Sequence, residues 1–176
     1  DLVTVGGYPG KLRDILGIWV EEEDALPEDM HNTFHYKGKT YPAFMLCDLL
    51  HTEGAEALAF YENDFYAGMP VLTKNAFGYG FGYYVATRSD DAFYREYLGE
   101  ICREAGIEPV MDAPDGIEVT RRVNKSGTFV FLLNHGEEAQ VMAAPFAGCD
   151  LLSGNNYAAG ETITLAAKGV LIIKSD

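Results

Sequence analysis

Residues 73–88 constrain the fold of this chain more than any other segment. Two β-prone runs, residues 70–73 and 82–86, flank a short stretch rich in glycine. Glycine adopts positive φ angles without a steric penalty, and tight hairpin turns need such residues. We therefore predict a β-hairpin here. A phosphate-binding loop would need its glycines to open a helix, whereas these glycines lead into a strand-like run.

Composition and charge exclude several classes of protein. The chain has 176 residues, enough for one large domain or two small ones, and its formal net charge is −14. This acidity argues against binding nucleic acid or anionic membranes, because both need clustered cations. No apolar run approaches the roughly 20 residues of a membrane span. Cys47, Cys102 and Cys149 form no CxxC motif, so we expect reduced thiols, which fits a cytoplasmic location.

The pattern of charges and turns divides the chain. Residues 1–112 carry 20 acidic and 8 basic side chains, whereas residues 113–176 carry 7 and 5. Prolines and a Pro-Asp-Gly turn signal lie just around this point. We predict two domains, residues 1–112 and residues 113–176. Residues 1–5 resemble the inside of a structured element and include no initiator Met, so we expect a piece of a longer protein.

The first domain is predicted to mix helices and strands. A short helix should end at Gly17, and residues 33–36 and 40–45 should form a hairpin. A longer helix should begin after Ser89 or Asp90 and run to about residue 104. The second domain is predicted to contain only strands, at residues 117–121, 129–133, 139–142, 162–165 and 169–173. Such short, closely spaced strands predict a small antiparallel sandwich.

Cys47, Asp48 and His51 could form a nucleophile and its base. The sequence around Cys47 lacks the strand–elbow–helix context that such a nucleophile needs. His51 is better explained as an interior histidine with a satisfied hydrogen bond than as a general base.

His31 and His35 are four residues apart and could share a metal ion if they lay on a helix. The hairpin predicted after them favours a strand, in which residues four apart lie about 13 Å from each other. His135 lies in a predicted turn and is expected to be solvated. We therefore predict no metal site.

Residues 21–29 hold 6 carboxylates and no cation. Glycoside hydrolysis needs paired carboxylates, but adjacent acids in a strand point to opposite faces. A solvated loop or a face that contacts a partner explains the run better. Ca²⁺ binding would need a loop spacing that is absent here.

Blocks of sequence at residues 6–10, 16–22, 46–56, 66–70 and 73–88 occur in an order and spacing that resemble family 42 glycoside hydrolases, the β-galactosidases. The most telling are Trp19-Val-Glu-Glu22, Leu46-Cys-Asp-Leu-Leu-His-Thr-Glu-Gly-Ala-Glu56 and Tyr84-Val-Ala-Thr-Arg88. Residues 130–135 and 169–173 resemble the C-terminal β domain of that family.

This resemblance implies a fold and a role. Such enzymes have a catalytic (β/α)₈ barrel, then an α/β domain of glutamine-amidotransferase-like (flavodoxin-like) form that mediates trimerisation, then a small β-sandwich. The chain would comprise the later part of the α/β domain and the sandwich, without the barrel. Neither catalytic glutamate of the family can therefore be assigned to any residue here.

The function that follows is non-catalytic. We expect an accessory region of a bacterial, cytoplasmic β-galactosidase that hydrolyses terminal β-D-galactosyl residues. Its partners would be its own catalytic barrel and identical subunits in a trimer. We predict no catalytic, cofactor-binding or metal-binding residue in this chain. Two alternatives stay open: a carbohydrate-binding module that uses some of the 11 tyrosines as stacking platforms, and an amidotransferase-like hydrolase that uses Cys47 and His51.

Overall fold

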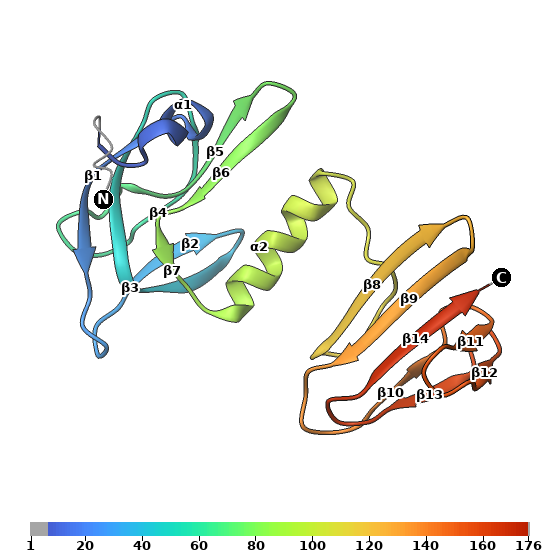
Figure 1. Cartoon of the computed structure of the whole chain (residues 1–176). Coiled ribbons are helices and arrows are strands. Elements are labelled where there is room, and N and C mark those ends of the chain that lie inside the picture. Colours follow the sequence, from blue (N-terminus) through green and yellow to red (C-terminus); the bar gives the residue numbers. More distant parts are fainter. Residues whose placement is uncertain (1–6, 176) are drawn as a thin grey trace, which may run out of the picture. The chain divides into compact units, whose positions relative to one another are not determined.

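The computed structural model describes residues 7–175, which form two compact units (Figure 1). The boundary between them in the sequence lies between Glu104 and Ala105. The prediction that residues 1–5 belong to a structured element lies outside the described residues. The two units are described separately below.

The first unit contains two antiparallel sheets and one long helix. One sheet has the order β1-β3-β2, with the short strand β7 also paired to β3, and the other has the order β4-β5-β6. The elements are η1 (Gly10–Leu12), α1 (Arg13–Leu16), β1 (Ile18–Ala25), β2 (Asn32–Tyr36), β3 (Lys39–Thr52), β4 (Glu56–Phe60), β5 (Pro70–Phe77), β6 (Gly80–Val85), β7 (Thr87–Arg88) and α2 (Asp91–Glu104).

The α/β, flavodoxin-like fold predicted for residues 1–112 is wrong. Every strand pair in the first unit is antiparallel, and only α2 is longer than a single turn of helix. Parallel strands need a crossover of a dozen or more residues, usually through a helix. The longest connection between consecutive strands here is residues 61–69, and most are far shorter. Such connections permit hairpins and meanders, so the unit is β-rich.

Strand β3 organises its sheet because it pairs with different partners along its length. Its first part pairs with β2, from Tyr36↔Lys39 to Asn32↔Ala43, and its second part pairs with β1. The change of partner occurs near Met45, whose φ of 67° is in the left-handed region. The pairing of β3 with β7 also shifts register between Phe44 and Cys47. This irregularity bends the strand and exposes Met45.

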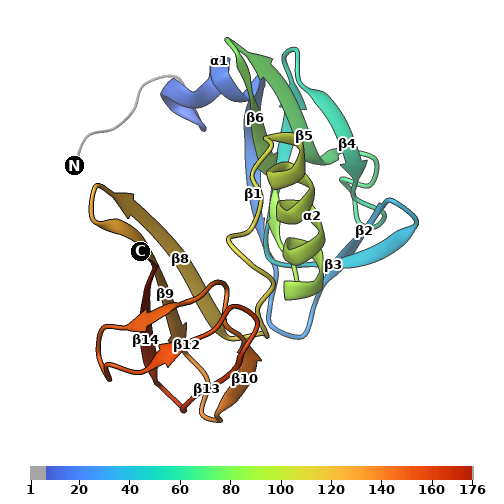
Figure 2. The ribbon, with the colours of Figure 1, turned by 90° about the vertical axis from the view of Figure 1, so that its right-hand side faces the viewer.

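An aromatic cluster forms the core between α2 and the sheets. Phe93 on α2 is fully buried and contacts Phe34 on β2 edge-to-face, at 5.1 Å between ring centroids. Tyr97 stacks on Phe93 and meets Tyr36 edge-to-face. In Figure 2, α2 crosses in front of the strands of its unit. The helix begins as predicted, because the Asp90 side chain accepts a hydrogen bond from the Phe93 amide.

Three glutamates at four-residue spacing connect α2 to the neighbouring strands and to the turn between β2 and β3. Each accepts a hydrogen bond from one tyrosine hydroxyl and pairs with one lysine. The sets are Glu96 with Tyr41 and Lys39, Glu100 with Tyr36 and Lys37, and Glu104 with Tyr83 and Lys74. The lysine and tyrosine donors lower the pKa of Glu96 and Glu104 below the usual 4.5. Burial alone would raise the pKa of Glu100, but its two donors outweigh burial and lower it.

These depressed pKa values predict an acid-dependent loosening of α2. A group with a lowered pKa in the folded state stabilises it fully above the unfolded pKa of 4.5, and this contribution is lost as pH falls through the folded value. We expect wild-type protein to lose this contribution between about pH 5 and pH 3, whereas a variant with Glu96, Glu100 and Glu104 all changed to Gln lacks it already at pH 7. Urea unfolding at pH 7 and at pH 3, followed by circular dichroism, gives the difference in free energy of unfolding between the two proteins at each pH. A difference that does not change with pH would contradict the prediction.

The predicted hairpin is present and consists of strands β5 and β6. Strands β5 and β6 pair from Leu72↔Val85 to Phe77↔Gly80, and Gly78 at the turn has φ of 57°. The helix α1 packs on this hairpin so closely that a Cβ on Gly82 would lie 2.5 Å from the Ile15 carbonyl oxygen. The hairpin thus needs glycine both for its turn and for this contact.

The second unit contains only strands. A five-stranded sheet has the order β12-β11-β14-β9-β8, and β10 pairs with β13, all antiparallel. The core lies between the two sheets and includes Leu132, Ile163 and Ile173. The strands are β8 (Ile117–Asn124), β9 (Gly127–Asn134), β10 (Gln140–Ala143), β11 (Gly148–Asp150), β12 (Asn156–Tyr157), β13 (Thr162–Leu165) and β14 (Val170–Ser175).

Two buried polar side chains fix the loops of the second unit. The Asn134 amide donates to the Glu138 and Ala166 carbonyl oxygens. The Asp150 carboxylate accepts from the amides of Ser153 and Ile172. Burial alone would raise the pKa of Asp150, but the hydrogen bond that the Ser153 hydroxyl donates and those from the backbone amides outweigh burial and lower the pKa. Both side chains therefore have structural roles.

Candidate functional site

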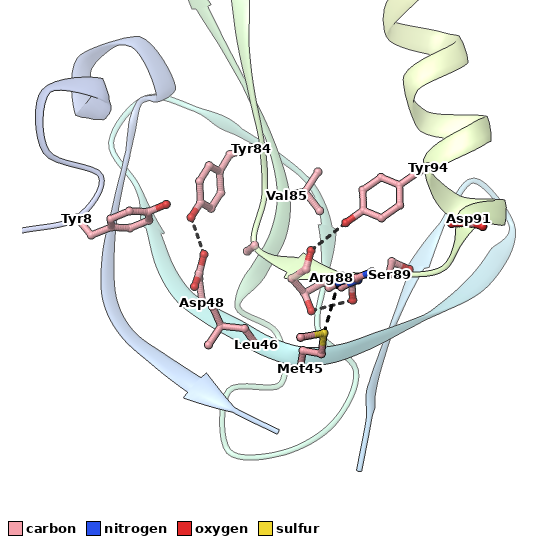
Figure 3. Close-up of a pocket in the computed structure, with 12 residues that line it drawn as sticks. Tyr8, Met45, Leu46, Asp48, Tyr84, Val85, Arg88, Ser89, Asp91 and Tyr94 are labelled. Atoms are coloured by element: carbon pink, nitrogen blue, oxygen red, sulfur yellow. Dashed lines mark hydrogen bonds between the residues drawn. The ribbon is translucent and has the colours of Figure 1, made fainter. Parts of the chain in front are cut away.

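The first unit has a surface hollow of about 670 Å³ (Figure 3). It is open to solvent and brings together segments far apart in the sequence. These are Tyr8 ahead of η1, the middle of β3, the end of β6, β7 and the start of α2. Its lining comprises Tyr8, Met45, Leu46, Asp48, Tyr84, Val85, Ala86, Thr87, Arg88, Ser89, Asp91 and Tyr94.

Asp48 lines this hollow and is only 6% exposed. The Tyr84 hydroxyl donates a hydrogen bond to its Oδ2 at 2.5 Å, while its buried Oδ1 has no hydrogen-bond partner. Burial raises the pKa of Asp48; the Tyr84 hydrogen bond opposes this rise, and the nearby Glu23 adds to it. Asp48 is thus a buried carboxylate whose surroundings disfavour its charged form, and only one of its two oxygens has a hydrogen-bond partner.

The rim of the hollow is partly apolar. Met45 has a left-handed backbone and is 57% exposed, and the Arg88 guanidinium lies 3.7 Å from its sulfur. The Ser89 hydroxyl donates to the Pro42 carbonyl, which fixes the chain where it enters α2. In Figure 3, Arg88 and Ser89 lie between Asp48 and Asp91, which occupy different ends of the hollow.

This arrangement does not form a glycosidase site. Hydrolysis with retention needs two carboxyl groups about 5–5.5 Å apart on either side of the sugar bond. In the hollow, Asp48 is bonded to a tyrosine hydroxyl and is separated from Asp91 by other side chains. The site can accept a hydrogen-bond donor or an apolar group, but it shows no acid–base pair.

The structure does not bring Cys47 and His51 together. Cys47 is fully buried, and its sulfur lies 3.6 Å from the Thr87 hydroxyl. The His51 ring stacks on Trp19, with 4.7 Å between centroids, and its Nε2 lies 2.6 Å from the Glu21 carboxylate. A buried thiol without a base is no activated nucleophile, so the geometry argues against the amidotransferase-like alternative.

The other candidate residues are dispersed. Glu21–Asp24 lie along β1 and are largely exposed, with a register shift between Val20 and Glu22. His35 is exposed on β2 beside Thr40, and His135 pairs with Glu118 at 2.9 Å. Within residues 7–175, no group of three or more potential ligands is arranged to hold a metal ion. No helix in that range is long and apolar enough to cross a membrane.

Sequence reasoning singled out Asp48 but missed Tyr84, Met45 and Arg88 as its neighbours. Tyr84 is 36 positions from Asp48 and belongs to a different sheet. Met45 has a positive φ although methionine has no preference for one, so its residue type does not indicate this conformation. Only Arg88, next to the expected helix start, had a local cue for its position.

Two family models together match most of the chain. Residues 1–108 match the β-galactosidase trimerisation domain, and residues 116–175 match the β-galactosidase C-terminal domain.

Individual proteins agree with these matches. A β-galactosidase of a Planococcus species is 44% identical over 98% of this chain and 26% of its own length. Another, from Clostridium perfringens, is 37% identical over 99% of this chain and 26% of its own length. The chain therefore spans about a quarter of these curated relatives.

Solved structures show the same relationship. The crystal structure of a β-galactosidase from Bacillus circulans sp. alkalophilus superposes with a TM-score of 0.85 at 40% identity, over 99% of this chain and 27% of that one. The cold-adapted β-galactosidase from a Rahnella species gives a TM-score of 0.80 at 35% identity, over 99% of this chain and 26% of that one.

Proposed function

Because the chain belongs to the family 42 β-galactosidases, in which it corresponds to the trimerisation and C-terminal domains, we propose that it assembles subunits and supports the catalytic barrel of a longer enzyme. That enzyme would hydrolyse terminal β-D-galactosyl residues through glutamates in the barrel. The observation that carries the proposal is the match of residues 1–108 to a trimerisation domain, together with a span of only about a quarter of each relative.

The side-chain contacts argue against the amidotransferase-like alternative. The hollow around Asp48 offers an isolated carboxylate, and Cys47 and His51 have separate partners. We propose domain bounds of residues 1–112 and 113–176, with the assembly role in the first domain. The enzyme would act as a trimer in the bacterial cytoplasm, without nucleic-acid or membrane partners.

Hydrolysis of a chromogenic β-galactoside tests the proposal directly. We expect no turnover above background by the 176-residue chain and clear turnover by the longer protein that contains it. We also expect that longer protein to be oligomeric by analytical ultracentrifugation, and a version truncated before residue 1 to lose its assembly. Turnover by the 176-residue chain alone would contradict the proposal, as would a longer protein that is monomeric.

A further inference from the structure

The turn end of the β5–β6 hairpin presents three exposed aromatic side chains. Tyr79 is fully exposed, and Phe77 and Phe81 are each about half exposed, at 50% and 51%. We call these three residues the aromatic tip. The hairpin projects from its sheet beyond α1 (Figure 1). The pairs Ala76↔Phe81 and Phe77↔Gly80 place Phe77 and Phe81 on opposite faces of the hairpin, with Tyr79 at the turn between them. Single exposed apolar residues are ordinary on a protein surface, but several large ones at the end of one hairpin indicate an interaction site.

The backbone of the hairpin and the Phe81 ring are held in place by their surroundings. The hairpin is fully paired as far as Phe77↔Gly80. The Lys74 ammonium lies 4.0 Å from the centroid of the Phe81 ring and also pairs with Glu104 on α2. A preorganised hairpin backbone loses little conformational entropy when it binds, which favours its use as an anchor. Tyrosine is also among the residues that dominate binding energy at interfaces.

The charge of the chain indicates which kind of partner fits. Residues 75–87 contain no Asp, Glu, Lys or Arg and form the longest such run in a chain of net charge −14. Two copies of so acidic a chain repel each other over most of their surfaces. An uncharged aromatic projection can make contact with a copy without placing like charges opposite each other.

We propose that the aromatic tip of one subunit docks onto a neighbouring copy of the same protein in the assembled enzyme. This inference rests on the proposed assembly role and names the element that carries it out. Closed three-fold symmetry requires heterologous contacts, so the tip of each subunit meets a different surface on the next. Tyr79 at the turn is the centre of this contact, and Phe77 and Phe81 extend it along the two opposite faces of the hairpin.

The experiment compares Tyr79→Ser with Phe65→Ser in the longer protein that contains this chain. Phe65 is 75% exposed in the same unit and lies in the loop between β4 and β5, so it controls for the loss of a surface aromatic. Mass photometry over a dilution series measures the concentration at which subunits dissociate. We expect Tyr79→Ser to raise that concentration at least tenfold and Phe65→Ser to leave it unchanged. Thermal unfolding of the 176-residue chain should be the same for Tyr79→Ser and wild type.

The other outcomes have separate meanings. If both variants assemble like wild type, the aromatic tip is not the contact, although the assembly role stands. If the two variants dissociate equally, docking of the aromatic tip onto a second copy is overturned. The same holds if the Tyr79→Ser oligomer stays intact and only its melting temperature or its turnover falls. If the wild-type protein is monomeric, the proposed function itself fails.

Discussion

Replacing Phe93 with alanine is expected to lower the free energy of unfolding of the first unit by about 3–5 kcal/mol. Phe93 is fully buried and joins α2 to the strands beneath it. Its ring contacts Phe34 at 5.1 Å, Tyr41 at 5.3 Å and Tyr97 at 5.2 Å between centroids. Alanine would remove these contacts and leave a cavity that the rigid neighbouring rings cannot easily fill.

Guanidinium unfolding, followed by far-ultraviolet circular dichroism, measures this effect. Phe65→Ala is the control, because Phe65 is mostly exposed and its change should alter the free energy of unfolding by no more than about 0.5 kcal/mol. A loss below about 1 kcal/mol for Phe93→Ala would mean that α2 does not depend on this ring for its attachment.

A second large effect is expected at Gly82. An added methyl group would lie 2.5 Å from the Ile15 carbonyl oxygen and 3.2 Å from its carbonyl carbon. Neither atom belongs to a flexible side chain, so α1 must move away from the hairpin. That movement would also disturb the hydrogen bond that the side-chain amide of Asn75 donates to the same Ile15 oxygen. We expect Gly82→Ala to lower the free energy of unfolding by about 2–3 kcal/mol.

Gly80 provides a matched control in the same strand. A methyl group on Gly80 would meet no atom within 4 Å, and its φ lies outside the left-handed region. Gly80→Ala should therefore be nearly neutral in the same denaturation experiment. Equal losses for the two variants would show that hairpin flexibility, rather than the contact with α1, explains the need for glycine.

Local signals in the sequence predicted several elements well. The β5–β6 hairpin follows from glycines between two β-prone runs, and Asp90 begins α2 by capping the Phe93 amide. Gly17 ends α1 with φ of 62°. Each of these depends on residues within a few positions of one another, so the chain itself carries the information.

The arrangement of the strands was predicted wrongly. The α/β expectation came from what the resemblance implied about a whole domain, but the short connections here allow only antiparallel neighbours. The turn signals that bound the strands already indicate such short connections, which favour hairpins over crossovers.

The sequence by itself determined the family, the turns, the helix caps and the strongly acidic character of this protein. Only the tertiary structure decided which distant side chains meet: Tyr84 with Asp48, the glutamates of α2 with their lysines and tyrosines, and α1 with Gly82. The physical reason is that such contacts depend on strand register. The left-handed Met45 and the register shifts in β3 and β1 set that register, and no local residue preference signals them.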